Sequence, residues 1–195
     1  MQMTINGYVG GPNGENDWMT WNPDEEFLAF LSSVFESSDT IVIGRKLATS
    51  GFIEFWEETA KQNPAHPFAK KIVDTQKIVF SKTLDQPKWN NTRLAKGNLA
   101  EEIDKLKNQK GKDILVIGGA GFASSMIDEG LVNEYHLIIN PTAMPGGMTI
   151  FSSLDGIAKF EPVGAKLYPG GKTVLTYQPK HDQYDYRKIH PAGID

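Results

Sequence analysis

Three short apolar runs, each followed at once by a small or cationic residue, constrain the fold of this chain most strongly. They lie at residues 41–43, 78–80 and 114–117, and they end at Gly44, Ser81 and Gly118. Continuous apolar runs of this length are typical of strands that are buried on both faces of a parallel sheet. Helical patterns separate the runs, so the sequence predicts an α/β fold in which helices connect parallel strands.

The other expected elements follow the same alternation. Residues 3–9 predict a short first strand, which leads into a glycine-rich loop at residues 10–16. Asn22 is expected to cap a helix that Pro23 opens. Further helices are expected within residues 45–75, broken by Pro64 and Pro67, at residues 99–108, and after Gly121 to about Glu129. Further strands are expected at residues 93–95 and 134–139, and at 160–167 and 172–177 as an antiparallel pair at the sheet edge.

Length and composition restrict the class of protein. At 195 residues the chain fits one domain, which we place at residues 1–178, before a polar tail at 179–195. A net charge of −4 without a basic block argues against nucleic acid as a partner. No signal peptide and no apolar stretch of ~18 residues is visible, so we expect a cytoplasmic protein without a membrane partner. There are no cysteines and the four histidines lack ligand spacing, so we expect no metal.

The ends of the three apolar runs have the chemistry of an anion site. The carboxyl ends of parallel strands share one sheet edge, and ligands bind there. Glycines such as Gly44 and Gly118 let a phosphate approach the backbone, and the N-terminus of a following helix attracts its charge. Arg45, Lys46 and Lys82 supply charge for a second phosphate, such as the 2′-phosphate of NADPH.

The usual dinucleotide fingerprint is incomplete at residues 119–124. Two of its three glycines are present, at Gly119 and Gly121, but Ser124 stands in the third place. Asn140 stands where an acidic residue would end the next strand. A standard Rossmann domain is therefore disfavoured.

Six segments carry a family resemblance through their order and spacing. They are residues 6–9, 17–18, 39–46, 79–84, 117–121 and 147–151. Together they resemble the reductase domain of the bifunctional riboflavin-biosynthesis deaminase-reductase and its stand-alone bacterial relatives, within the dihydrofolate-reductase-like superfamily. The resemblance covers nearly the whole chain to about Tyr177.

The resemblance implies a dihydrofolate-reductase-like three-layer fold, with helices on both faces of a mostly parallel central sheet and an antiparallel C-terminal edge. It also implies a homodimer and an NADPH-dependent reductase. By similarity, the residues that would hold the cofactor are Gly44, Arg45 and Lys46 for the adenosine-side phosphates, Ser81 and Lys82 beside the 2′-phosphate, and Gly118, Gly119, Ala120, Gly121 and Phe122 around the pyrophosphate.

The default substrate implied by the resemblance is the ribosyl group of an aminopyrimidine, as in 5-amino-6-(5-phosphoribosylamino)uracil reductase. Three positions depart from the family pattern, one of which is Pro145 in place of a common glycine. Asn6 replaces the usual carboxylate of the opening motif, and Leu47 replaces the usual threonine after Gly-Arg-Lys. Two alternatives therefore stay open, which are a dihydrofolate reductase and a nucleotide-binding module without turnover. A scaffold protein with a blocked cleft is a third.

Hydride transfer to such a substrate also needs a proton, so an acid is expected near the site. Asp24 lies within about 40° of the apolar stripe of the first helix, and burial there is expected to raise its pKa. Glu26 loosely resembles the catalytic acid of true dihydrofolate reductases in its position. The alternative is that both carboxylates only complement the helix dipole.

The loop at residues 9–21 resembles the mobile flap that closes over nicotinamide and substrate, which would exclude water from hydride transfer. Trp18 and Trp21 could stack on a flat heterocycle, and Asn6 is a third candidate for substrate contact. The two tryptophans could instead attach the loop to the first helix.

Overall fold

The computed structural model describes residues 1–180, whose eight strands form two four-stranded sheets. The first sheet is entirely parallel, in the order β4-β3-β2-β5. Its strands are β2 (Ser38–Gly44), β3 (Gln76–Phe80), β4 (Thr92–Ala95) and β5 (Asp113–Ile117). The three apolar runs are therefore adjacent parallel strands, as the sequence predicts.

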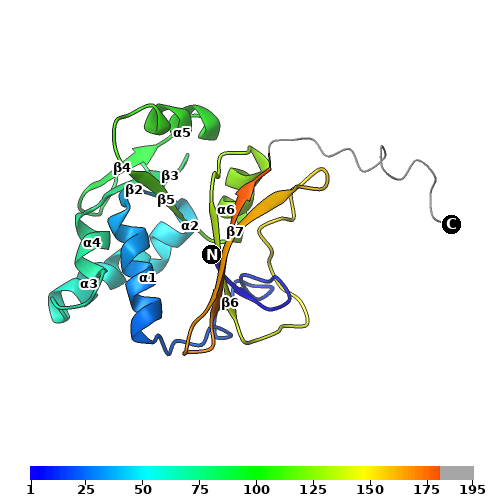
Figure 1. Cartoon of the computed structure of the whole chain (residues 1–195). Coiled ribbons are helices and arrows are strands. Elements are labelled where there is room, and N and C mark those ends of the chain that lie inside the picture. The colour runs from blue at the N-terminus through cyan, green and yellow to red at the C-terminus, as the bar shows by residue number, and fades with distance from the viewer. Residues whose placement is uncertain (181–195) are drawn as a thin grey trace.

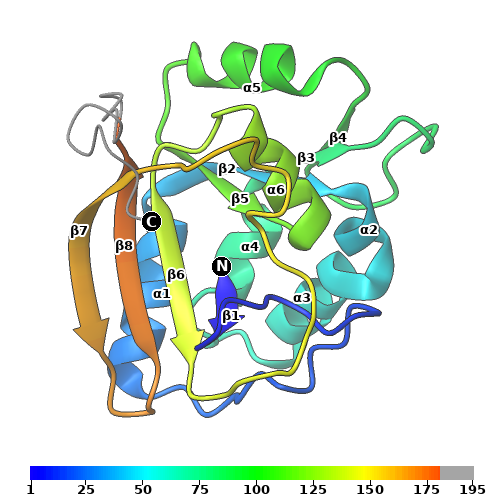
Figure 2. The ribbon, with the colours of Figure 1, turned by 90° about the vertical axis from the view of Figure 1, so that its right-hand side faces the viewer.

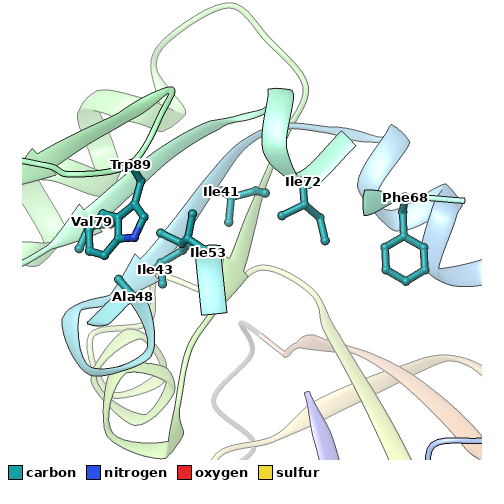
Figure 3. Packing of buried hydrophobic residues seen from close by; sticks show 8 residues of the cluster. All are labelled: Ile41, Ile43, Ala48, Ile53, Phe68, Ile72, Val79 and Trp89. Atoms are coloured by element: carbon teal, nitrogen blue, oxygen red, sulfur yellow. The ribbon is translucent and has the colours of Figure 1, made fainter. Parts of the chain in front are cut away.

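Helices cover both faces of this sheet (Figure 1). Those on one face are α1 (Glu25–Glu36), α3 (Ile53–Gln62) and α4 (Ala69–Asp74), and those on the other are α5 (Leu99–Lys107) and α6 (Ala120–Asp128). Alternate residues of β2 point to opposite faces, so Ile41 and Ile43 join the first cluster while Val42 joins the second. Figure 3 shows the first cluster, in which the β2 side chains pack against Ile53 and Ile72.

The second sheet has the order β1-β6-β8-β7, and only the β1–β6 pair is parallel. Its strands are β1 (Gln2–Thr4), β6 (Tyr135–Asn140), β7 (Phe160–Leu167) and β8 (Thr173–Pro179). The last two form the antiparallel edge that the sequence predicts. Figure 2 shows β1 between β5 and β6. The fold class is confirmed, but no backbone pairing among residues 1–180 joins β5 to β1, so the expected central sheet is divided.

Two helices hold the sheets together. Leu31 of α1 packs against the core of the parallel sheet and also against the cluster around Phe27 and Val174, beside β8. On the opposite face, Met126 of α6 packs with β2 while Ile127 packs with β1 and β6. Burial of apolar surface on both helices therefore replaces the missing backbone ladder.

The N-terminal region differs from the expected strand and helix boundaries. β1 ends at Thr4 because the chain turns back there, with the Gly7 amide donating to the Thr4 carbonyl at 3.0 Å and Gly7 at a φ of 88°. The N-cap of α1 is Asp24 rather than Asn22, since its carboxylate accepts from the amide of Phe27 at 2.9 Å. Both differences come from local side-chain or turn hydrogen bonds that compete with regular structure.

The region between β2 and β3 is a broken helix, as expected. α2 (Arg45–Leu47) continues through the π-helical turn η1 (Ala48–Phe52) into α3. Gly51 has a φ of 93°, which only glycine adopts without strain, and it marks the break. Among residues 1–180 no helix is both long and apolar enough to cross a membrane. The predicted boundary between domain and tail at residue 178 stays a prediction, and residues 181–195 lie outside the described part.

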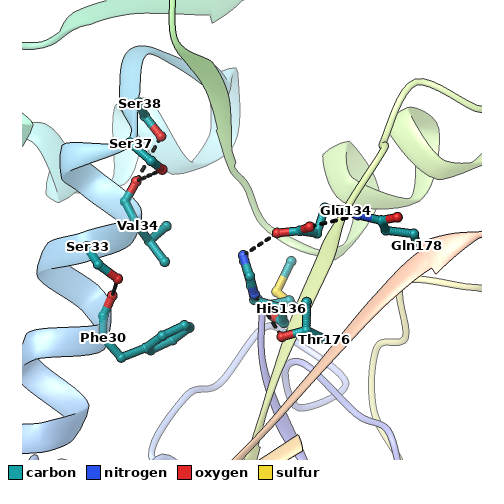
Figure 4. A network of polar contacts seen from close by, with 10 residues as sticks. Phe30, Ser33, Val34, Ser37, Ser38, Glu134, His136, Thr176 and Gln178 are labelled. Atoms are coloured by element: carbon teal, nitrogen blue, oxygen red, sulfur yellow. Dashed lines mark hydrogen bonds and ion pairs between the residues drawn. The ribbon is translucent and has the colours of Figure 1, made fainter. Parts of the chain in front are cut away.

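A polar network ties β6 to its neighbours (Figure 4). The ring nitrogens of His136 lie 3.1 Å from Glu134 and 3.2 Å from Thr176, and the ring packs edge-on against Phe30 of α1. Burial lowers the pKa of His136, although Glu134 opposes that shift. Burial therefore disfavours the protonated imidazole where the sheet meets α1.

Lys77 is a buried cation that ends a helix. Its side chain is 1% exposed, and its ammonium donates to the carbonyls of Ile72, Val73 and Thr75 at 3.2, 2.8 and 2.9 Å. These carbonyls belong to the last turn of α4 and the residue after it, where helical partners are missing. Burial lowers the pKa of Lys77, while Glu57 and Asp74 oppose the shift.

We expect Lys77→Met to lower the free energy of unfolding by about 2–3 kcal/mol, because three buried carbonyls lose their donor. Urea denaturation measures the change. Lys70→Met is the matched control, since its ion pair with Asp74 is solvent-exposed and should contribute less than about 1 kcal/mol. Equal losses for the two variants would show that Lys77 does not cap α4.

Candidate functional site

The carboxyl ends of β3, β2 and β5 meet at one sheet edge. Ile43 pairs with Val79 on one side and with Ile117 on the other, and Gly44 pairs with Phe80. Gly44, Ser81 and Gly118 therefore follow three adjacent strand ends at the same level. The predicted convergence of these turns is confirmed.

Phe122 explains two of the glycines. A Cβ atom added to Gly44 would lie 2.7 Å from Cβ of Phe122, and one added to Gly118 would lie 2.8 Å from its ring. The ring also packs against Phe80 at 5.5 Å between centroids. Phe122 thus seats the first turn of α6 directly over the ends of β2 and β5. These glycines admit a phenyl ring, which differs from the phosphate approach that the sequence suggested.

The N-terminus of α6 opens onto this edge with unpaired amides. Its N-cap is Gly119, which supplies no side-chain hydrogen bond, and the first amide bonded back along the helix is that of Ala123. A Cβ atom at Gly119 or Gly121 would meet nothing within 4 Å. The amides of residues 120–122 can therefore donate hydrogen bonds to an anion, which the positive end of the helix dipole also attracts.

Four cationic side chains surround the same edge. Arg45 and Lys46 follow β2, Lys82 follows β3, and all three are exposed. The sequence reasoning missed Lys96, which is exposed directly after β4. The pairing of Phe80 with Ala95 brings Lys96 level with Ser81, and this pairing was not visible from the short 93–95 pattern. None of the four makes an ion pair within residues 1–180.

Ser81 has a structural role in its turn. Its hydroxyl oxygen accepts from the amides of Thr83 and Leu84 at 3.2 and 3.0 Å, and its own amide donates to the Ala95 carbonyl at 3.1 Å. Only the hydroxyl proton is left for a ligand. The turn presents the neighbouring Lys82 side chain to solvent.

Asn6 joins the loop after β1 to the loop after β6. Its amide nitrogen donates to the carbonyl of Met144 at 2.7 Å, and its amide oxygen accepts from the Met144 amide at 3.3 Å. The same two loops continue as a short antiparallel bridge, in which Val9 donates to Met148 and Met148 to Gly10, both at 2.8 Å. A carboxylate at position 6 could not donate the hydrogen bond to the Met144 carbonyl.

The loop before α1 is anchored by a buried lysine. Lys172 is 2% exposed, and its ammonium donates to the carbonyl of Thr20 and to the side-chain oxygen of Asn140, the latter at 2.7 Å. Trp21, next to Thr20, is 59% exposed, whereas Trp18 is half-buried and donates to the Glu15 carbonyl at 3.1 Å. Of the two tryptophans, Trp21 has the face available for stacking.

Asp24 and Glu26 already have partners. The carboxylate of Asp24 accepts from Phe27 and from Gly170 at 2.8 Å in the β7–β8 turn. Partial burial opposes the charge of Asp24, but these backbone amides outweigh it, so its pKa is lowered. The expected rise in pKa is therefore wrong. Glu26 lies 2.7 Å from Lys166 in an exposed ion pair.

Residues 1–174 match the model of a family described as the RibD C-terminal domain. The chain belongs to the RibD C-terminal domain family. It is 31% identical over 181 residues to the uncharacterized protein YyaP of Bacillus subtilis (strain 168), and the match covers 91% of each chain.

Two solved structures resemble this RibD C-terminal domain in fold. A protein from Shewanella sp. PV-4 ascribed to riboflavin biosynthesis has a TM-score of 0.66 and 22% identity, over 93% of this chain and 97% of that one. The diaminohydroxyphosphoribosylaminopyrimidine deaminase/5-amino-6-(5-phosphoribosylamino)uracil reductase of Thermotoga maritima has a TM-score of 0.61 and 12% identity, over 92% of this chain and 55% of that one.

The structure of this RibD C-terminal domain brings the predicted site residues together in two groups. The expected cofactor residues all lie at the ends of β2, β3 and β5 or on the first turn of α6. Asn6, Trp18, Trp21 and Asp24 lie in or beside the loops after β1 and β6, with Glu26 on the first turn of α1. Met3 of β1 packs with Ala123 of α6, so β1 lies against the helix that begins at the cofactor edge. Within residues 1–180 no cluster of metal ligands occurs. The role of each residue stays a prediction.

Gly44→Ala is expected to lower the free energy of unfolding by about 1–3 kcal/mol, because the added methyl group overlaps Phe122. Adding Phe122→Ala should cost less in the Gly44→Ala background than in the natural chain, a coupling that urea denaturation of the double-mutant cycle measures. Gly119→Ala, where the space is open, should change stability by less than about 0.5 kcal/mol. Additive losses would contradict the packing of Phe122 on Gly44.

The lowered pKa of Asp24 predicts a pH dependence of stability. A carboxylate with a lowered native pKa stabilises the fold above its ordinary pKa, and that share is lost as the pH falls below about 4. The stability difference between the natural chain and Asp24→Asn should therefore shrink between pH 6 and acid, as followed by thermal unfolding. Asp17→Asn, at an exposed position of the preceding loop, is the matched control for the removal of one carboxylate. A constant difference for Asp24→Asn would overturn this assignment.

Proposed function

We propose that this chain is an NADPH-dependent reductase that transfers a hydride to a small heterocyclic or ribosyl-pyrimidine substrate. The observation that carries the proposal is the meeting of an uncapped helix N-terminus with four unpaired cations at one sheet edge. A dinucleotide with a 2′-phosphate presents three phosphates and fits such an edge. Membership of the RibD C-terminal domain family supports the reductase class.

The residues present fit this cofactor. The amides at the start of α6 would hold the pyrophosphate, where Gly119 and Gly121 leave open space. Arg45, Lys46 and Lys82 would hold the remaining phosphate charge, with Lys96 beside them. The bound cofactor would supply the hydride. The loops joined by Asn6 would bound the space next to the reacting ring and limit the entry of water.

The substrate side of the proposal rests on resemblance. The Thermotoga maritima relative is named as a 5-amino-6-(5-phosphoribosylamino)uracil reductase, which makes the corresponding reaction the default for this chain. Dihydrofolate reduction is the alternative within the same fold class. A homodimer, a small-molecule substrate and a cytoplasmic location stay predictions.

A nucleotide-binding module without turnover is the second candidate. Neither expected general acid is arranged to hold a proton, which favours this candidate. Asp24 has a lowered pKa, and Glu26 is paired with Lys166. A general acid for a reductase needs a proton near neutral pH, and a lowered pKa works against this. Their catalytic role therefore stays a prediction, tested by the pH profile of Asp24→Asn.

Arg45→Ala tests the cofactor assignment. If the guanidinium meets the 2′-phosphate, the variant should bind NADPH about tenfold more weakly, whereas NADH affinity should change by less than about twofold. Titration of nicotinamide fluorescence measures both dissociation constants. Lys61→Ala on α3, whose side chain is 75% exposed, is the control and should change neither. Equal losses for the two cofactors would show that Arg45 does not contact the 2′-phosphate.

The absorbance of the nicotinamide band then separates the two candidate functions. Oxidation of NADPH with an aminopyrimidine or pterin substrate supports the reductase. Binding of NADPH without oxidation on any such substrate supports the module, and a failure to bind either cofactor removes both.

A further inference from the structure

The first 44 residues contain seven acidic side chains and no lysine or arginine. They include β1, the loop that leads to α1, and α1 itself. Residues 141–158, which form the loop after β6, also contain no lysine or arginine. The two segments that adjoin the cofactor edge on the substrate side therefore bring no exposed cation to it.

The cationic groups that reach this region within residues 1–180 are already occupied. Lys166 pairs with Glu26 at 2.7 Å, and the Met1 ammonium donates to the His136 carbonyl. Lys172 is 2% exposed, and its ammonium is occupied by Thr20 and Asn140, all through neutral oxygens. Burial lowers its pKa, and no carboxylate offsets that shift. Its three donors are consumed in anchoring the loop.

The one helix N-terminus on this side is also occupied. Asp24 caps α1 and accepts from Phe27, and Glu25 and Glu26 fill the first turn. A carboxylate therefore already holds the position that an external anion would take. Glu15 and Asp17 in the preceding loop add further negative charge.

The groups that this side does expose are apolar or neutral. Ile5 is 65%, Trp21 is 59% and Met148 is 38% exposed. Ile5 follows Thr4, and Thr4 pairs with Asn140, which Thr20 also approaches at 3.5 Å. Ile5 and Trp21 thus extend from neighbouring positions. The hydroxyl of Thr142 lies close by in sequence and is buried without a partner within residues 1–180.

The site is therefore divided by charge. Its cofactor half, over β2, β3 and β4, carries four unpaired cations and an open helix N-terminus. Its other half, over β1 and β6, exposes acidic, neutral and apolar groups, and its cations are paired or buried. A phosphate dianion placed there would face carboxylates without an unpaired counter-charge, which disfavours its binding.

We propose that the substrate of this chain is a planar heterocycle that carries no phosphate group. This inference rests on the proposed reductase function and narrows it, since it sets aside the phosphoribosyl substrate that the family default implies. The ring would pack on Ile5, Trp21 and Met148.

A matched pair of ligands tests the proposal. The ribosylaminopyrimidine and its 5′-phosphate are titrated against the full chain loaded with NADP⁺, and quenching of tryptophan fluorescence gives each dissociation constant. We expect the unphosphorylated compound to bind about tenfold more tightly or better. Equal or tighter binding of the phosphate, or no binding of either, overturns the proposal. A failure of the proposed function is distinguishable from this, because NADP⁺ added alone in the loading step would then not change the tryptophan fluorescence.

A new cation in the neutral half provides the second arm. Ile5→Lys should raise the affinity for the phosphorylated compound about tenfold relative to the unphosphorylated one at low salt, because both ligands lose the same apolar contact and only the phosphate gains a counter-charge. Phe55→Lys on α3, 60% exposed and distant in the fold, adds the same net charge and should alter neither. If Phe55→Lys has the same effect as Ile5→Lys, or if Ile5→Lys has none, the phosphate does not lie on this half and the proposal fails.

Discussion

The parallel pairing of β2 with a neighbour on each side is the constraint on which the rest of the structure depends. Val42 and Ile43 are fully buried, and each pairs with a residue of β3 and a residue of β5. A slip of one residue in either ladder would move every side chain of that strand to the opposite face and disrupt the packing of both apolar clusters. The register is therefore fixed by burial, and it sets three strand ends level. The position of Phe122, and with it the N-terminus of α6, follows from that alignment.

Much of this arrangement could be predicted from the sequence, because it depends on local patterns. Short apolar runs predict strands that are buried on two faces, and the residue after each run predicts which side chain lies at the sheet edge. Arg45, Lys46 and Lys82 were found in this way. Lys96 was missed because β4 is only four residues long and its pattern is weak. Its neighbours in space are set by pairing with β3, which the sequence does not display.

The features that sequence reasoning could not find are contacts between distant segments. Asn6 bonds to Met144, 138 positions away, and Lys172 bonds to Thr20, 152 positions away. No periodicity reports such pairs. The same holds for Asp24, whose helical-wheel position suggested an inward acid, whereas the β7–β8 turn supplies an amide that keeps it charged. The sequence predicts that the glycines at the strand ends let a phosphate approach the backbone, whereas Gly44 and Gly118 leave space for the side chain of Phe122. The division of the sheet beside β5 was also invisible, since it reflects a β1 strand of only three residues.

The hydrogen bonds between Asn6 and Met144 make the contact between the two loops independent of pH. It consists of an amide side chain and a backbone peptide, neither of which gains or loses a proton under physiological conditions. An aspartate in the same place would hold its neighbour only through an acceptor whose strength varies with its ionisation. The hydrogen bonds that join the two loops therefore persist on acidification, so the spacing of the loops does not depend on pH.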